Sequence, residues 1–181
     1  MLPSNVMKKL FALLLVFSLP QLSWAQMLFF HADLTGTQEV PSNASPAIGF
    51  ADAVLDVPTS MLSFTTTWSG LLSPTTNGHI HTAPIGVSGP VVINFPGLPL
   101  GNTFGTYTNN FALTPTQVTN LIGGLDYVNI HTSGFPGGEI RGQLLAVPGA
   151  VPEPSTYALG GAALLAFLAY RRFRSASATS T

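Results

Sequence analysis

The sequence predicts an all-β domain, a Greek-key or immunoglobulin-like β-sandwich with one short helix. Three observations support this prediction. Glycine and proline recur at short intervals through the middle of the chain. The runs between them alternate apolar and polar residues with period two, which is typical of half-buried strands. The chain has no cysteine, so the antibody-type sandwich with its buried disulfide has no support.

The first 25 residues are predicted to be a secretory signal peptide. Lys8 and Lys9 precede an apolar run over residues 10–19, and small residues lead up to Ala25. We expect cleavage after Ala25. An uncleaved membrane anchor is the alternative, but the run is shorter than the roughly 20 residues that a spanning helix needs.

The β domain is predicted over residues 26–147, with strands wherever the period-two alternation holds. These strands are expected at residues 29–35, 48–57, 61–69, 91–95, 103–111, 125–132 and 139–145, and His79-Ile80-His81 is also expected to be extended. The alternation assigns one face of each strand to the core. The predicted inward residues are Phe30, Ala32, Leu34, Ala51, Ala53, Leu55, Val57, Leu62, Phe64, Trp68, Val91, Ile93, Phe95, Val128 and Ile130.

One segment, residues 114–124, is predicted to be a short helix. Thr114 is a candidate N-cap, Pro115 suits the first helical position, and Gln117 completes a capping box. Gly123 marks the C-terminal end. Val118, Leu121 and Ile122 form its expected apolar stripe.

The charge of the predicted domain argues against nucleic-acid partners. Arg141 is its single basic residue, whereas six acidic residues give it a net charge of about −5. Such a surface repels phosphate backbones. The absence of cysteine also excludes thiol catalysis.

The histidines provide the strongest candidate for a chemical site. His79 and His81 share one face of an extended segment, and His131 lies in a second segment that repeats the letters IHT. If the two segments pair, three imidazoles meet and could bind zinc or copper as a cofactor.

The favoured interpretation of the histidines is instead a structural hydrogen-bond network that also includes Asn129, Glu139 and Arg141. Glu139 and Arg141 are two residues apart, so they are expected to form an ion pair on one face. No catalytic residue is predicted. Ser88 lies in GVSGP, which lacks the pattern of a nucleophile elbow, and Glu39 has no evident partner in the sequence.

The C-terminal segment, residues 148–181, combines three features: a VPEP sequence, an apolar run expected to form a transmembrane helix at about residues 156–170, and an arginine cluster. Its key residues are Val151, Pro152, Glu153, Pro154, Arg171, Arg172 and Arg174. The arginines predict a cytoplasmic C-terminus and an external domain. A plain tail anchor is the alternative.

This order of features resembles the bacterial PEP-CTERM sorting signal. The resemblance implies export, processing by an exosortase, and transient anchoring in the inner membrane. It also implies a bacterium that makes extracellular polysaccharide.

Several blocks of the predicted domain, in this order, are similar to the CHRD domain, which is named after the repeats of chordin. These blocks are LTGTQEVP at 34–41, WSGL at 68–71, GHIHTAPIGVSGPVV at 78–92, YVNIHT at 127–132 and PGGEIRGQL at 136–144. The resemblance implies an architecture and no particular catalytic residues. We therefore expect a non-enzymatic binding or structural protein of the cell envelope or extracellular polysaccharide matrix. A metal-binding protein or metalloenzyme using His79, His81 and His131 is the alternative.

Overall fold

The computed structural model describes residues 26–148, 161–162 and 164–167. Strands dominate the described domain. In chain order the elements are β1 (Met27–Thr35), the 3-10 helix η1 (Gly36–Gln38), β2 (Ile48–Asp56), β3 (Met61–Ser69), β4 (Thr75–Thr82), β5 (Val91–Asn94), β6 (Gly105–Ala112), α2 (Pro115–Ile122), β7 (Asp126–Thr132), β8 (Ile140–Gln143) and β9 (Leu145–Ala146).

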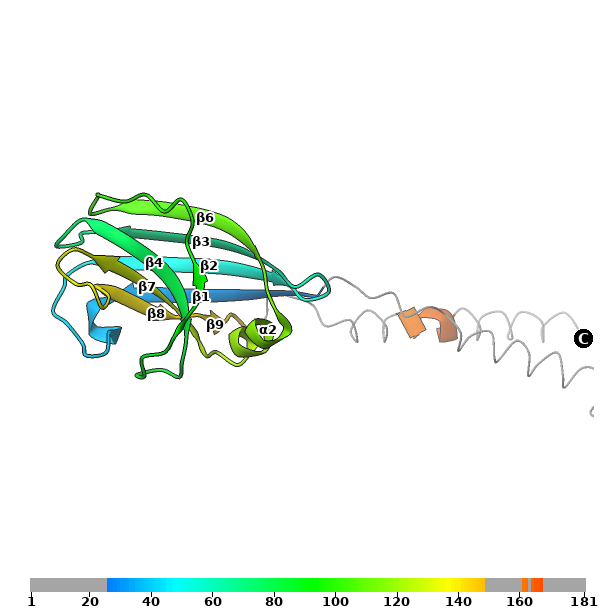
Figure 1. The fold of residues 1–181 in the computed structure, drawn as a ribbon. Coiled ribbons are helices and arrows are strands. Elements are labelled where there is room, and N and C mark those ends of the chain that lie inside the picture. Colours follow the sequence, from blue (N-terminus) through cyan, green and yellow to red (C-terminus); the bar gives the residue numbers. More distant parts are fainter. Residues whose placement is uncertain (1–25, 149–160, 163, 168–181) are drawn as a thin grey trace, which may run out of the picture.

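The strands form one continuous antiparallel sheet that curls on itself (Figure 1). The order is β5-β4-β7-β8-β1-β2-β3-β6, and β9 also pairs with β1. The concave side of this curled sheet holds the core. Phe95, just after β5, stacks on Tyr107 of β6 with 4.8 Å between ring centroids, so the two edges of the sheet meet across that core.

The all-β prediction is confirmed, but the prediction of a sandwich of two separate sheets is corrected. The strands that would form two layers are joined through β1, because Thr35 pairs with Arg141 of β8. Phe30 and His31 pair in the same way with Ala146 and Leu145 of β9. The right-handed twist of neighbouring strands then accumulates around the sheet and closes it over the core.

The predicted inward faces are largely those that pack in the core, with Phe30, Phe64 and Trp68 among its largest fully buried side chains. Val91 is an exception, with 42% of its surface exposed. The pairing of β4 with β5 shifts register between Ile80 and His81, and β5 is an edge strand. A register shift of this kind changes which side chains of the edge strand face the core.

The short helix is confirmed with the capping residues that the sequence predicts. In α2 the Thr114 hydroxyl accepts from the backbone N–H of Gln117, whose side chain in turn accepts from the N–H of Thr114. Gly123 is the C-cap. Leu121 is buried, Val118 packs against the core, and Ile122 of the predicted stripe is exposed. Gln117 Nε2 also donates to the carbonyl oxygen of Val92, which ties α2 to the edge strand β5.

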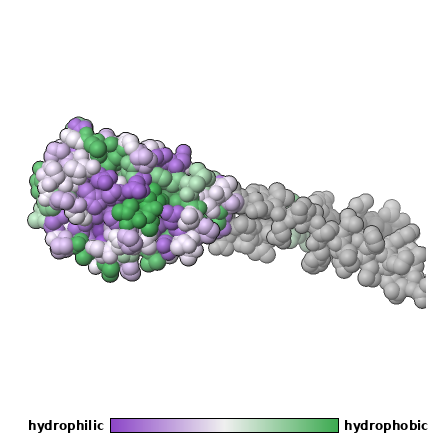
Figure 2. Space-filling model, viewed as in Figure 1, coloured by the Kyte–Doolittle hydropathy of each residue, from purple (hydrophilic) through white to green (hydrophobic). Residues whose placement is uncertain are grey.

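The outer surface mixes hydrophilic and hydrophobic residues. Figure 2 shows one hydrophobic patch near the middle of the visible face of the domain, with hydrophilic residues around it. A mixed outer surface is expected where each strand buries alternate side chains on the concave side and exposes the others.

Some predictions concern segments for which the structure gives little or no description. The predicted signal peptide, residues 1–25, lies outside the described residues. Of the predicted transmembrane helix, only residues 161–162 and 164–167 are described, and these are helical. Within the described part of the chain, no helix is long and apolar enough to cross a membrane. The domain boundaries at residues 25 and 147 stay predictions.

Candidate metal centre

Three of the four histidines lie together on the outer face of two neighbouring strands. His79 and His81 come from β4 and His131 from β7. Because alternate strand residues share a face, Ile80 points into the core and the two flanking histidines point out. In the antiparallel register, His131 pairs with Asn77 and Asn129 pairs with His79, which brings the His131 ring beside the His79 ring.

The three imidazoles are close enough to share one ion. One nitrogen from each ring can be chosen so that all three lie within 4.8 Å of one another. His79 Nδ1 and His131 Nε2 are 3.1 Å apart. Two nitrogens bound tetrahedrally to zinc at its usual bond length lie about 3.3 Å apart. The first pair already has this spacing, and the chosen nitrogen of His81 lies within 4.8 Å of both.

Backbone carbonyls orient two of the rings. His81 Nδ1–H donates to the carbonyl oxygen of Gly89 at 3.0 Å, and His131 Nδ1–H donates to that of Pro136 at 3.0 Å. Since a carbonyl only accepts, each neutral ring carries its proton on Nδ1 and its lone pair on Nε2. An N–H to carbonyl bond of this kind fixes the tautomer and orientation of metal-binding histidines in general.

Burial keeps all three histidines in the neutral form that binds metals. Loss of contact with water lowers the pKa of His79, His81 and His131, and that of His131 falls to about 4. The neighbouring histidines lower the pKa of His131 further, whereas its bond to Pro136 acts in the opposite direction. His131 is therefore neutral at any pH near 7, and its Nε2 lone pair faces His79 Nδ1 at 3.1 Å.

The outer face around these histidines is itself buried, which is unusual for an outward strand face. Its other buried residues are Tyr127, Asn129, Arg141 and Gln143. The segment between β4 and β5 covers part of it, because Gly89 N–H donates to the Tyr127 hydroxyl and Gln143 donates to the carbonyl oxygen of Ala83. The segment between β7 and β8 covers another part through Pro136 and Gly137.

Within this buried layer, Arg141 packs on the ring of Tyr127. Its guanidinium carbon lies 3.4 Å from the centroid of the Tyr127 ring, and His81 stacks on that ring at 5.0 Å with a 10° angle between planes. Because β7 lies between β4 and β8, Tyr127 separates the cation from the histidine. The positive charge of Arg141 lowers the pKa of His81 further.

Glu39, which follows η1, is also buried over this face. Asn129 Nδ2 donates to Glu39 Oε2 at 3.4 Å. Glu39 Oε1 and Asn129 Oδ1 are both buried and have no hydrogen-bond partner among the described residues. Burial raises the pKa of Glu39 to about 7, although Arg141 and Asn129 act in the opposite direction.

The predicted polar network is only partly the one that forms. Asn129 and Arg141 pair across β7 and β8 and lie in the same buried layer as the histidines. The expected ion pair between Glu139 and Arg141 does not form. Glu139 precedes the first residue of β8 and follows Gly138, whose φ is 129°, so its side chain does not follow the strand alternation. It instead accepts from Ser45, Leu72 and Thr132.

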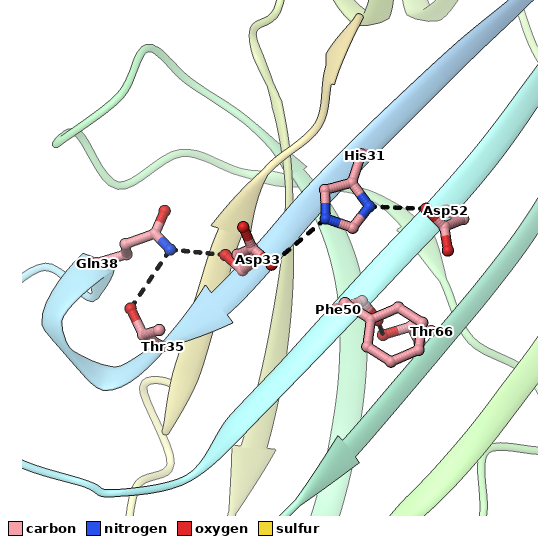
Figure 3. A network of polar contacts seen from close by, with 7 residues as sticks. All are labelled: His31, Asp33, Thr35, Gln38, Phe50, Asp52 and Thr66. Carbon is pink, nitrogen blue, oxygen red and sulfur yellow. Dashed lines mark hydrogen bonds and ion pairs between the residues drawn. The ribbon is translucent and has the colours of Figure 1, made fainter. Parts of the chain in front are cut away.

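The fourth histidine, His31, lies elsewhere, on the outer face of β1 (Figure 3). Its Nδ1 is 2.7 Å from Asp52 Oδ1 of β2, and its Nε2 is 3.3 Å from Asp33 Oδ1. Both partners only accept, so the charged imidazolium suits this position. The hydrogen bond to Asp52 is the main cause of the raised pKa of His31. The stability that this contact adds is fully present below the ordinary pKa and is lost as the pH rises through the folded value.

We expect Asp52→Asn to lower the pKa of His31 towards its ordinary value of 6.5, because the amide cannot stabilise the charged ring as the carboxylate does. The measurement is an NMR titration of the His31 ring protons. Asp33→Asn is the matched control, and its longer contact predicts a smaller change. An unchanged pKa in Asp52→Asn would show that this carboxylate does not hold the ring.

Ser88 is placed as its turn sequence suggests. It is exposed, and its hydroxyl donates to the carbonyl oxygen of Val40. Sequence patterns did not reveal the roles of Gly89 and Pro136, because their carbonyls reach the histidines only through the fold. The sequence does not indicate that Asn129 is the hydrogen-bond partner of Glu39.

Two segments of the chain are similar to known protein families. The family described as CHRD domain matches residues 30–144. The PEP-CTERM protein-sorting motif matches residues 150–174, which include Val151–Pro154 and the three C-terminal arginines. Of that stretch, only residues 161–162 and 164–167 are among those that the structure describes. No curated protein and no solved structure was found to match.

Proposed function

The chain belongs to the CHRD domain family, and we propose that its domain is a non-enzymatic module that binds one transition-metal ion, zinc or copper. The observation that carries this proposal is the placement of three imidazole nitrogens within 4.8 Å of one another. Imidazole is a preferred ligand of both metals, and three histidines suffice to hold zinc with one position left open.

A metal ion accounts for the site better than a purely structural network does. His81 Nε2 is buried and has no partner among the described residues, although its other nitrogen is bound to Gly89. Leaving such a group unpaired costs free energy, so buried polar atoms in native proteins nearly always have partners. A bound ion would take up the lone pair of this nitrogen.

The sorting motif supports a proposed location for the protein. A PEP-CTERM motif implies export, sorting to the cell surface and processing by an exosortase. We infer that the signal peptide directs export and that the C-terminal helix anchors the protein in the inner membrane before processing. The processed protein then belongs to the cell envelope or the extracellular matrix.

A second candidate function is binding to neutral extracellular polysaccharide. One observation favours it. On the outer face of β3 and β6, two threonine pairs, Thr65–Thr108 and Thr67–Thr106, form an uncharged row of hydroxyl groups. Hydroxyl groups of this kind can donate to and accept from sugar hydroxyls.

The metal content of the full-length chain, purified without a histidine tag and measured by mass spectrometry, tests the proposed function. We expect about one zinc or copper per chain after incubation with either ion, and none in His81→Ala. His31→Ala is the matched control because His31 lies outside the cluster, and it should retain the ion. A wild-type chain that binds neither metal would contradict the proposal and return the histidines to a structural role.

For sorting, we expect that replacing residues 151–154 with glycine and serine leaves the protein unprocessed in the inner membrane, because the exosortase no longer recognises it. Cell fractionation with an antibody against the domain measures this. Processing and release at the wild-type level would show that the VPEP sequence is not required.

A further inference from the structure

We propose that the metal centre binds one small monovalent anion at the coordination position that the three histidines leave open. This inference rests on the proposed metal function and names the class of ligand for the same site. It follows from the balance of charge around His79, His81 and His131.

The ligands themselves do not neutralise a bound ion. The cluster consists of three imidazoles, and no carboxylate of the described residues belongs to it. The groups behind the rings are also neutral, because His81 and His131 donate to the carbonyls of Gly89 and Pro136. A carboxylate that accepted a hydrogen bond from the second ring nitrogen of a metal-binding histidine would have added negative charge. A divalent ion at this site therefore keeps its full charge.

The nearest cation increases this excess of positive charge. Arg141 is buried against one face of Tyr127, while His81 stacks on the same ring. In the described part of the chain, ion pairs involve only His31, Asp33 and Asp52, so Arg141 has no carboxylate at ion-pair distance. Its single hydrogen-bond acceptor in these residues is the carbonyl oxygen of Pro84, at 3.5 Å.

The acidic groups of the layer cannot offset the charge of the metal. Glu39 is the acid whose charge acts on Arg141, so at most it offsets that residue. It is also held by Asn129 rather than by a histidine. Two positive charges would remain in a buried layer, where an uncompensated charge is costly. A small anion on the metal reduces this cost.

The geometry also leaves a route for such a ligand. His81 and His131 are about nine-tenths buried, whereas His79 is only half-buried. His79 therefore lies on the side from which a ligand can approach. The ring centroids are 4.9 to 5.8 Å apart, so the open position adjoins three ring edges and suits a ligand of a few atoms.

The test is an azide titration of the full-length chain loaded with Co²⁺, whose visible absorption reports its coordination. We expect a saturable change in this spectrum on adding sodium azide, and the same response with sodium acetate at higher concentration. If Co²⁺ does not bind, the proposed metal function itself fails. If Co²⁺ binds with a histidine-type spectrum that azide does not change, the metal function stands and the anion site is overturned.

Substitutions of Arg141 provide a second test of the anion site. We expect Arg141→Met, which retains much of the packing on Tyr127, to bind azide several-fold more weakly while still binding Co²⁺. Arg141→Lys keeps the charge and should bind azide nearly as the wild type does. Equal azide affinities in wild type and Arg141→Met would overturn the role given to this charge. The wild-type titration remains decisive if either variant fails to fold.

Discussion

Replacing His131 with alanine is expected to weaken zinc binding on the order of 100-fold or more. Losing only the hydrogen-bond partner of a metal-binding histidine already lowers metal affinity about 10- to 100-fold. His131 is one of the two most buried ligands, and its Nε2 lies only 3.1 Å from His79 Nδ1. Its removal leaves two ligands on one strand. The measurement is a competition titration against a chromophoric chelator.

The control for this variant is His31→Ala, which removes a histidine that binds two aspartates on the opposite half of the sheet. It should bind zinc as the wild type does. Equal zinc affinities in His131→Ala and wild type would contradict the assignment of this ligand.

His131→Ala should also change how stability depends on pH. The pKa of His131 is depressed to about 4 in the folded chain, so its contribution is fully present above the ordinary value of 6.5. It is lost as the pH falls from about 6.5 through about 4. The metal-free wild type should therefore lose more stability over this range than the metal-free variant. Denaturant unfolding at several pH values measures the difference.

Glu139→Ala is expected to reduce the free energy of unfolding by about 3 kcal/mol or more, since each buried hydrogen bond to a charged group contributes about 1.5–3 kcal/mol. The Glu139 side chain is 0% exposed. It accepts from Leu72 N–H at 2.6 Å and from the hydroxyls of Ser45 and Thr132 at 2.7 Å each. These donors come from three separate segments, so the substitution leaves three donors without their partner, and the Thr132 hydroxyl among them is buried.

Urea unfolding, followed by tryptophan fluorescence, measures this loss. Glu139→Gln is the matched control, because it keeps the volume and one acceptor oxygen and should lose less stability than the alanine variant. A loss below about 1 kcal/mol in Glu139→Ala would mean that water replaces the carboxylate at this position.

The sequence could predict those features that depend on local alternation. Ile80 between two histidines and Val128 and Ile130 in β7 are buried as period two requires, and Thr114 and Gln117 cap the helix as their spacing indicates. The same alternation placed His79, His81 and His131 outward. The alternation does not indicate whether their two segments are neighbours, because strand pairing depends on the whole sheet.

Features that depend on contacts between distant segments could not be predicted. Tyr127, Asn129 and Arg141 point outward yet are buried, because loops from elsewhere in the chain cover them. Glu139 departs from strand alternation because the positive φ of Gly138 turns the chain just before β8. The single curled sheet depends on the pairing of β8 and β9 with β1, for which a period-two pattern carries no signal.

X-ray absorption at the zinc edge of the zinc-loaded full-length chain tests the central claim most directly. We predict three imidazole nitrogens and one further light atom at about 2.0–2.1 Å from the zinc, with the multiple-scattering features of histidine rings. These features should be lost in His81→Ala. A spectrum of hydrated zinc, or of zinc held by carboxylates alone, would contradict the assignment of His79, His81 and His131 as a metal centre.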